Sequence, residues 1–344
     1  MEFQLSREAL LRVLNHVSSI VDSRSTISIL SNLYIKCENN QIEIRSTDMD
    51  ISIKEFVSAD STKNGEATVN ARIFTDIIRK TKKNTIIKVK NEQNRLTINS
   101  ENSVFELNSL SAEEFPKFVP LDKENSFELN VEQIKKIFTK TKFAISSEET
   151  RYYLNGVYFH TVKSDEKNIL KAVATDGHRL AKTELVISSS IEIEGIILPR
   201  KFILQLDKIL GDFEGKIKIV CSETQVSFEA DNFVIISKLI DGKFPDYEKV
   251  IPISNDKFLE VESEPFFNAI DRISTVNQDK TPTVKLAFDN NSIKIMASST
   301  ESNKGDEEVP ANYTSSPLEI LFNSKYLLDL RDVLESQNIN LELL

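Results

Sequence analysis

The stretch ATDGHRLAK, residues 174–182, contains the side chains best suited to chemistry. Asp176 and His178 lie two residues apart, and a carboxylate near an imidazole suits proton transfer because unperturbed histidine titrates near neutral pH. One hypothesis is therefore a hydrolase that uses this pair. No Ser or Cys near the pair lies in a nucleophile-elbow pattern, and the repeats described below have no His at the equivalent position. We therefore expect no catalytic residues.

Cofactor and metal sites are not expected either. The two cysteines, Cys37 and Cys221, are far apart, and with three histidines they cannot build a zinc cluster or a disulfide framework. The chain contains no GxxxxGK[ST] or GxGxxG pattern and only eight glycines. Nucleotide hydrolysis is therefore not expected.

Charge and hydropathy indicate the compartment and class of protein. The formal net charge is −10, and no apolar run is long enough to span a membrane. The opening MEFQLSREALLRVL mixes charged and apolar residues as an amphipathic helix does, unlike a signal peptide. We expect a cytoplasmic protein, and one that binds nucleic acid only where its positive charges are gathered together.

A unit that repeats three times must position these residues. FQLSREALLRVLNHVSSIV is echoed by FELNVEQIKKIFTKTKFAI and LEVESEPFFNAIDRISTV, and VNARIFTDIIRKTKK by LPRKFILQLDKIL and FNSKYLLDLRDVL. The first three segments each read as a strand followed by a helix, and the second three read as helices. Between them, apolar and polar residues alternate along the chain, as in antiparallel hairpins. ATDGHRLAK is the middle copy of a strand-end motif, equivalent to STDMDISI and ASSTE.

These repeats predict an α+β protein of three tandem domains, each with two helices on antiparallel sheets. We place the domains at 1–123, 124–253 and 254–344, with polar turn-rich segments at both boundaries. The third copy ends soon after its second helix, so we expect it to lack the last hairpin.

Four motifs occur in one order along the chain: RYYLNGVYF, ATDGHRLA, LPRKFI and SKLIDGKFPDYEKVIP. Together with the threefold repeat they resemble the bacterial DNA polymerase III beta subunit family, the sliding clamps, over the whole chain. The resemblance implies a head-to-tail homodimeric ring around duplex DNA, a processivity factor that tethers the replicative polymerase. Its implied partners are the polymerase alpha subunit, the clamp loader, and other polymerases and repair proteins with clamp-binding peptides, on the nucleoid.

Basic residues gather on the helices expected to line the hole, at 71–83, at 131–142 and from residue 200. Such a surface attracts phosphates without reading sequence, although a solvated basic face on a protein-binding scaffold stays an alternative. From charge and resemblance together, the expected DNA-binding residues are Arg24, Arg79, Lys80, Lys135, Lys136, Arg151, Tyr152, Tyr153, Arg200 and Lys201. Either tyrosine could instead pack in the core.

The resemblance also implies that ATDGHRLAK forms one wall of a cleft between the second and third domains, which receives a short peptide. The matching residues are Leu154, Thr175, Gly177, His178, Arg179, Leu180, Pro245, Val250, Asn323 and Tyr326. Apolar walls with polar groups at the rim suit a peptide that ends in leucine or phenylalanine. The sequence departs from the family in ending at NINLELL, without a Met-Pro-Met-basic tail, and in having Lys249 where many relatives have arginine. ATDGHRLAK is thus expected to bind a partner and not to catalyse a reaction.

Overall fold

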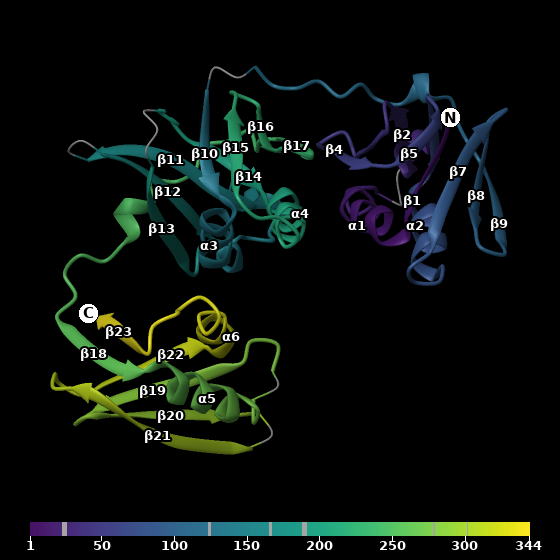
Figure 1. Ribbon diagram of the computed structural model, residues 1–344. Helices are drawn as coiled ribbons and strands as arrows, with labels where there is room; N and C mark the ends of the chain where they lie inside the picture. The colour runs from purple at the N-terminus through teal and green to yellow at the C-terminus, as the bar shows by residue number, and fades with distance from the viewer. Residues whose placement is uncertain (23–25, 123–124, 165–166, 188–190, 278, 301) are drawn as a thin grey trace. The chain divides into compact units, whose positions relative to one another are not determined.

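The computed structural model describes residues 1–22, 26–122, 125–164, 167–187, 191–277, 279–300 and 302–344. Its contacts divide the chain into two compact units, Met1–Lys243 and Phe244–Leu344 (Figure 1). Each unit is described by itself.

The first unit contains two copies of the repeated element. The first copy consists of β1 (Glu2–Ser6), α1 (Arg7–Val17), β2 (Asn32–Glu38), β3 (Gln41–Thr47), β4 (Ile51–Ser58), β5 (Asp60–Lys63), β6 (Gly65–Asn70), α2 (Ala71–Lys80), β7 (Ile86–Glu92), β8 (Arg95–Ser100) and β9 (Ser103–Asn108). The second consists of β10 (Ser126–Asn130), α3 (Val131–Thr141), β11 (Gly156–Ser164), β12 (Lys167–Thr175), β13 (Leu180–Ile187), β14 (Ile196–Pro199), α4 (Arg200–Leu210), β15 (Lys216–Cys221), β16 (Gln225–Ala230) and β17 (Phe233–Lys238). Short 3-10 turns, η3 (Lys142–Ala144) and η4 (Glu149–Leu154), follow α3.

The second unit contains the third copy. It consists of η5 (Tyr247–Val250), β18 (Lys257–Glu262), α5 (Ser263–Ser274), β19 (Thr283–Asp289), β20 (Ser292–Ser298), β21 (Lys304–Tyr313), β22 (Leu318–Asn323), α6 (Ser324–Leu328) and β23 (Asn338–Leu343). In the described chain one strand, β23, follows α6, whereas three strands follow both α2 and α4. β23 pairs with β18 at the edge of a six-stranded antiparallel sheet.

The helices begin where the sequence has capping residues. The Ser6 side chain accepts the Ala9 N–H, and Asn130 and Gln133 form a capping box at the start of α3. The expected helical spacing is confirmed, since the apolar positions of α1, α3 and α5 are buried against the sheets. α2 ends at Lys80, three residues before the sequence predicted, because Thr81 adopts an extended conformation.

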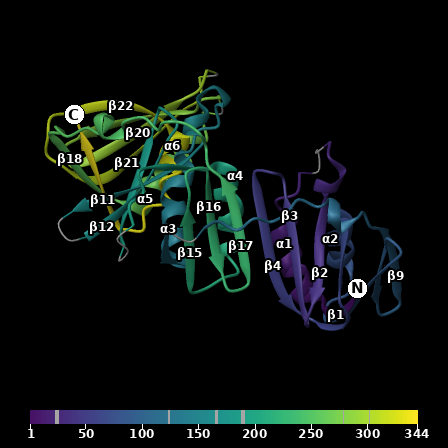
Figure 2. The same ribbon diagram turned by 90° about the horizontal axis from the view of Figure 1, so that it is seen from above.

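One sheet crosses from the first copy to the second. Its order is β10-β15-β16-β17-β4-β3-β2-β6, and β17 pairs antiparallel with β4 from Ser237 opposite Ile51 to Phe233 opposite Glu55 (Figure 2). Buried His16 adds to this junction, with Nδ1 2.9 Å from Glu55 Oε2 and Nε2 3.0 Å from Asp212 Oδ2. The two copies also share one hydrophobic core, and the second unit has its own.

Candidate functional site

The stretch that opened the sequence analysis is a tight turn between β12 and β13. The Asp176 Oδ1 atom accepts the N–H groups of His178 at 2.9 Å and Arg179 at 3.0 Å. The Thr175 hydroxyl donates to the Arg179 carbonyl at 2.7 Å and accepts the Gly177 N–H at 3.1 Å. Asp176 therefore braces the turn, as Asx residues commonly do, and its second oxygen accepts Arg179 Nε at 3.1 Å.

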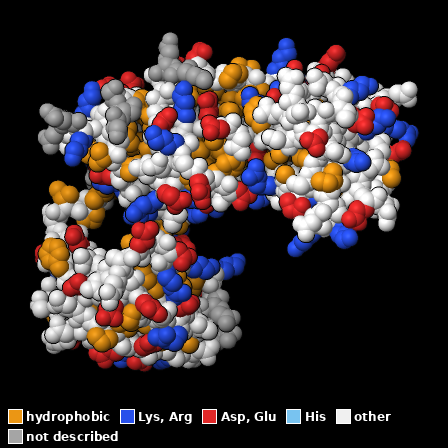
Figure 3. Space-filling view, in the orientation of Figure 1, with side chains coloured by type: hydrophobic (Ala, Val, Ile, Leu, Met, Phe, Trp, Pro, Cys, Tyr) orange, Lys and Arg blue, Asp and Glu red, His pale blue; other side chains and the backbone are white. Residues whose placement is uncertain are grey.

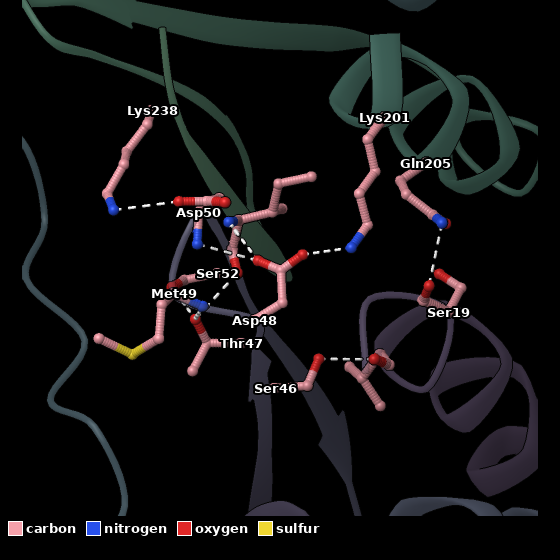
Figure 4. Close-up of polar contacts among 12 residues, drawn as sticks. Ser19, Ser46, Thr47, Asp48, Met49, Asp50, Ser52, Lys201, Gln205 and Lys238 are labelled. Carbon is pink, nitrogen blue, oxygen red and sulfur yellow. Dashed lines mark hydrogen bonds and ion pairs between the residues drawn. The ribbon is translucent and has the colours of Figure 1, made fainter. Parts of the chain in front are cut away.

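The first copy contains the same turn between β3 and β4 (Figure 4). Asp48 Oδ1 accepts the N–H groups of Asp50 at 2.9 Å and Ile51 at 2.7 Å, and the Thr47 hydroxyl donates to the Ile51 carbonyl at 2.9 Å. Met49 has a φ of 76°, close to the 87° of the equivalent Gly177. Because the same turn forms around Thr-Asp in the first copy, where Asp50 stands at the position of His178, its geometry is structural and does not depend on His178.

In the first copy this turn binds the neighbouring copy. The carboxylate of Asp48 pairs with Lys201 at the start of α4, and Asp50 Oδ1 lies 3.0 Å from Lys238 Nζ at the end of β17 (Figure 4). Gln205 of α4 donates to the Ser19 carbonyl at 2.9 Å. A Thr-Asp turn of this fold is thus already used once as a docking surface.

In the second copy the turn is surrounded by residues of η3 and η4. Arg179 Nη2 donates to the Phe143 carbonyl at 2.5 Å, and its guanidinium lies over the Phe143 ring, 5.2 Å from the centroid. Arg151 of η4 approaches Gly177, and Leu154, the last residue of η4, is buried. Six of the predicted cleft residues therefore lie in the first unit, on η4 or along the β12–β13 turn that Arg151 of η4 approaches: Leu154, Thr175, Gly177, His178, Arg179 and Leu180.

The other four predicted cleft residues belong to the second unit. Pro245 is exposed, Val250 ends η5 with 68% of its surface exposed, and Tyr326 lies half-buried on α6. The Asn323 side chain caps α6 by accepting the Lys325 N–H at 3.0 Å. A cleft that joins both sets of residues stays a prediction.

Six of the predicted DNA-binding residues lie on helices that are neighbours in the first unit: Arg79, Lys80, Lys135, Lys136, Arg200 and Lys201. α1 contacts α2 and α4, and α3 contacts α4, so the four helices form one row (Figure 1). Lys80 and Arg200 are exposed. Some of the others have acidic neighbours: Arg79 Nη1 lies 2.8 Å from Asp76 Oδ1, and Lys135 Nζ lies 3.4 Å from Glu132 Oε1.

Four further DNA-binding predictions concern residues outside these helices: Arg24, Arg151, Tyr152 and Tyr153. Tyr152 is 54% exposed and meets Tyr153 edge to face, with ring centroids 5.8 Å apart. Tyr152 is therefore a surface ring that a base could stack on, and not a core side chain. Arg24 lies outside the described residues.

Charge on the face shown in Figure 3 is mixed, with Lys and Arg side chains (blue) interspersed with Asp and Glu (red) over each unit. Within the described residues, no group of His, Cys, Asp and Glu could hold a metal ion. No described helix is both long and apolar enough to cross a membrane.

Sequence reasoning missed the contacts between the copies. Asp48 and Lys238 were not singled out, and Lys201 was predicted to contact DNA, whereas here its ammonium pairs with Asp48. Aligning STDMD with ATDGH shows the shared Thr-Asp pair, but the partner lysines follow only from the β4–β17 pairing.

Comparison with known proteins gives one family along the whole chain. Family models of the DNA polymerase III beta subunit match with its N-terminal domain at residues 1–119, its central domain at 128–246 and its C-terminal domain at 248–344. The Beta sliding clamp of Caulobacter vibrioides is 36% identical over 96% of this chain and 90% of the relative. That of Escherichia coli is 32% identical over 100% of this chain and 93% of the relative.

Solved structures agree with the sequence relatives. The DnaN sliding clamp of Bartonella birtlesii bound to griselimycin superposes with a TM-score of 0.95 at 37% identity, covering 100% of this chain and 92% of that one. The beta sliding clamp of C. crescentus superposes with a TM-score of 0.93 at 35% identity, with the same coverage, and its description places polyethylene glycol at a beta-motif tethering region.

Proposed function

Since the chain belongs to the DNA polymerase III beta subunit family, the DNA sliding clamps, we propose that two copies close head to tail into a ring around duplex DNA. A sliding clamp is a processivity factor, and is not itself catalytic. The hydrolase hypothesis for Asp176 and His178 is therefore wrong. The three-domain division at 123/124 and 253/254 is part of the proposal.

The observation that carries the ring is the strand pairing between the first two copies. There the last strand of one copy, β17, pairs with the fourth strand of the copy before it, β4. β9, the last strand of the first copy, is a sheet edge. β21 is the third copy's equivalent of β4: its residues 304–310 pair with β20, and only residues 311–313 pair with β18 on the other side. Pairing β9 of one chain with β21 of another repeats the junction, and two such contacts related by a twofold rotation close the assembly.

The β9 edge has the apolar character that an obligate contact needs. Val104 is 64% exposed and Phe105 37% exposed. Beside them is a cavity of about 450 Å³ whose lining includes Ile73, Ile77 and Phe105. Uncovered apolar edges favour association with another strand.

Sedimentation equilibrium tests the ring. The protein is expected to be a dimer at micromolar concentration, and Phe105→Asp is expected to shift it toward monomer because a charge would be buried in the contact. Val119→Asp is the matched control, since Val119 is exposed in the segment after β9. A wild-type monomer at these concentrations, or equal dissociation of both variants, would contradict the proposed contact.

The DNA contact is proposed to run along the row of helices α2, α1, α4 and α3. Its lysines and arginines neutralise phosphates without reading bases, which lets a ring slide while its topology retains it. The proposed contacts include Arg24, Arg79, Lys80, Lys135, Lys136, Arg151, Tyr152, Tyr153, Arg200 and Lys201. A scaffold that binds proteins only remains the competing function, and it predicts no DNA binding.

Partner proteins are proposed to dock their peptides at the Thr-Asp turn of the second copy. The equivalent turn of the first copy already binds a neighbouring domain through Asp48 and Asp50. Pro245, Val250, Asn323 and Tyr326 are proposed to supply the rest of the cleft. The expected ligands are the polymerase III alpha subunit, the clamp loader, and other polymerases and repair proteins, in the cytoplasm and on the nucleoid.

A further inference from the structure

The guanidinium of Arg151 is held by an acidic residue of its own segment. Nε lies 2.7 Å and Nη2 2.6 Å from the same oxygen, Oε2 of Glu148. Arg151 has φ −110° and ψ 51°, so the helical turn of η4 is kinked at this residue. The arginine side chain keeps 35% of its surface exposed and the glutamate keeps 51%. Both groups can therefore be reached from solvent.

The other side of the same guanidinium covers the Thr-Asp turn of the second copy. A Cβ atom added to Gly177 would lie 2.5 Å from Arg151 Nη1, so the guanidinium rests directly on the glycine backbone. The hydrogen bond that Arg151 donates to Glu148, together with the charge of Glu148 and smaller contributions from Tyr153 and Asp176, raises the pKa of Arg151. The arginine is thus a fixed positive charge between η4 and the turn.

We propose that Glu148 is a positioning residue that competes with DNA phosphate for the guanidinium of Arg151, and holds it over Gly177 when no DNA is bound. The inference rests on the proposed DNA contact of Arg151. Carboxylate and phosphate oxygens are the same kind of partner for an arginine fork, and an exposed ion pair is weak enough to be exchanged. When phosphate takes the guanidinium, the backbone of Gly177 is uncovered, so DNA binding and access to the turn are linked.

The test uses the full chain and a fluorescein-labelled primer–template duplex, with anisotropy measured across a series of salt concentrations. Glu148→Gln is expected to tighten binding about two- to fivefold at low salt, because the competitor for Arg151 is removed. The slope of log K against log salt is expected to steepen by about one, which corresponds to one additional phosphate contact. Glu149→Gln is the matched control: it removes the same charge one residue away, and Glu149 has no ion pair within the described residues.

The inference requires that the effect of Glu148→Gln on DNA affinity depend on Arg151. In the Arg151→Gln background, Glu148→Gln is expected to leave DNA affinity unchanged. Equal effects of Glu148→Gln and Glu149→Gln would overturn the inference, since a general charge effect would then explain both. So would a Glu148→Gln effect that persists without Arg151.

One further variant separates failure of the inference from failure of the proposed function. If Arg151→Gln leaves affinity unchanged while Lys136→Glu weakens it, the helices bind DNA but the competition at Arg151 is wrong. If both leave it unchanged, the proposed DNA surface is wrong as well, and the inference falls with it. Far-ultraviolet circular dichroism confirms that each variant is folded.

Discussion

The Thr-Asp pair determines the turn at residues 47–51 and again at 175–179, through the same hydrogen bonds from one hydroxyl and one carboxylate. The residue after the aspartate differs, Met49 in one copy and Gly177 in the other, although both have positive φ. Glycine therefore serves a second purpose at 177. It leaves room for Arg151, which lies where a side chain would be.

Replacing that glycine gives the first prediction. Gly177→Ala is expected to cost about 1–2 kcal/mol of stability, because alanine is strained at φ 87°, and to weaken binding of a clamp-binding peptide because the added methyl group occupies the space directly over the turn. Thermal unfolding and fluorescence binding measure the two effects.

Gly215→Ala is the control for backbone strain, because Gly215 has φ 92° and nothing within 4 Å of an added Cβ. It is expected to lower stability and leave peptide binding intact. Equal peptide binding by wild type and Gly177→Ala would contradict a role for the turn.

A second residue-scale prediction concerns the thiols. Burial raises the pKa of Cys221 to about 12 and also raises the pKa of Cys37, so the reactive thiolates are scarce at neutral pH. Both thiols are expected to react with a disulfide reagent at pH 8 at least a hundredfold more slowly in the folded protein than in guanidinium. Rapid reaction of either thiol in the native state would contradict this.

At the scale of elements, the basic helix α3 offers a direct test of DNA binding. Lys135→Glu and Lys136→Glu are each expected to weaken binding to duplex DNA about three- to tenfold at low salt, and to reduce the salt slope by about one. Fluorescence anisotropy measures both quantities.

Lys216→Glu is the control, because Lys216 lies on strand β15, paired with Glu128, and not on a helix. It is expected to leave DNA affinity close to that of wild type. An equal loss in all three variants would indicate a response to net charge and not to the α3 surface.

Element types were predictable from sequence because they follow from local patterns. Apolar spacing in α1 and α3, with Ser6 and Asn130 at their starts, depends only on neighbouring residues. Helix ends were less predictable: α6 stops at Leu328, although the apolar pattern continues to Leu334. Arg331 then donates to the Phe267 carbonyl of α5 at 2.9 Å. That contact between the two helices is tertiary and leaves no mark in local periodicity.

At the scale of the whole molecule, the shared sheet and core of the first two copies predict how the protein unfolds. The first unit is expected to unfold as one cooperative transition and the second unit as another in differential scanning calorimetry. Ile235→Ala, at a buried position of β17 opposite Ile53, is expected to lower the free energy of unfolding of the first unit by about 2–5 kcal/mol.

The matched variant in the second unit is Ile295→Ala, equally buried on β20. This variant is expected to lower the midpoint temperature of the second unit's transition and to leave that of the first unit unchanged. Separate transitions for the first and second copies would contradict the shared core.

The sequence by itself determined the threefold repeat, the α+β class and the turn around each Thr-Asp pair, because periodicity, capping and turn chemistry act between residues close along the chain. Only the tertiary structure decided that β4 pairs with β17, that Lys201 meets Asp48, and that Arg151 covers Gly177. These contacts join segments distant in sequence, and their stability depends on which edges and charges remain unsatisfied once each copy has folded.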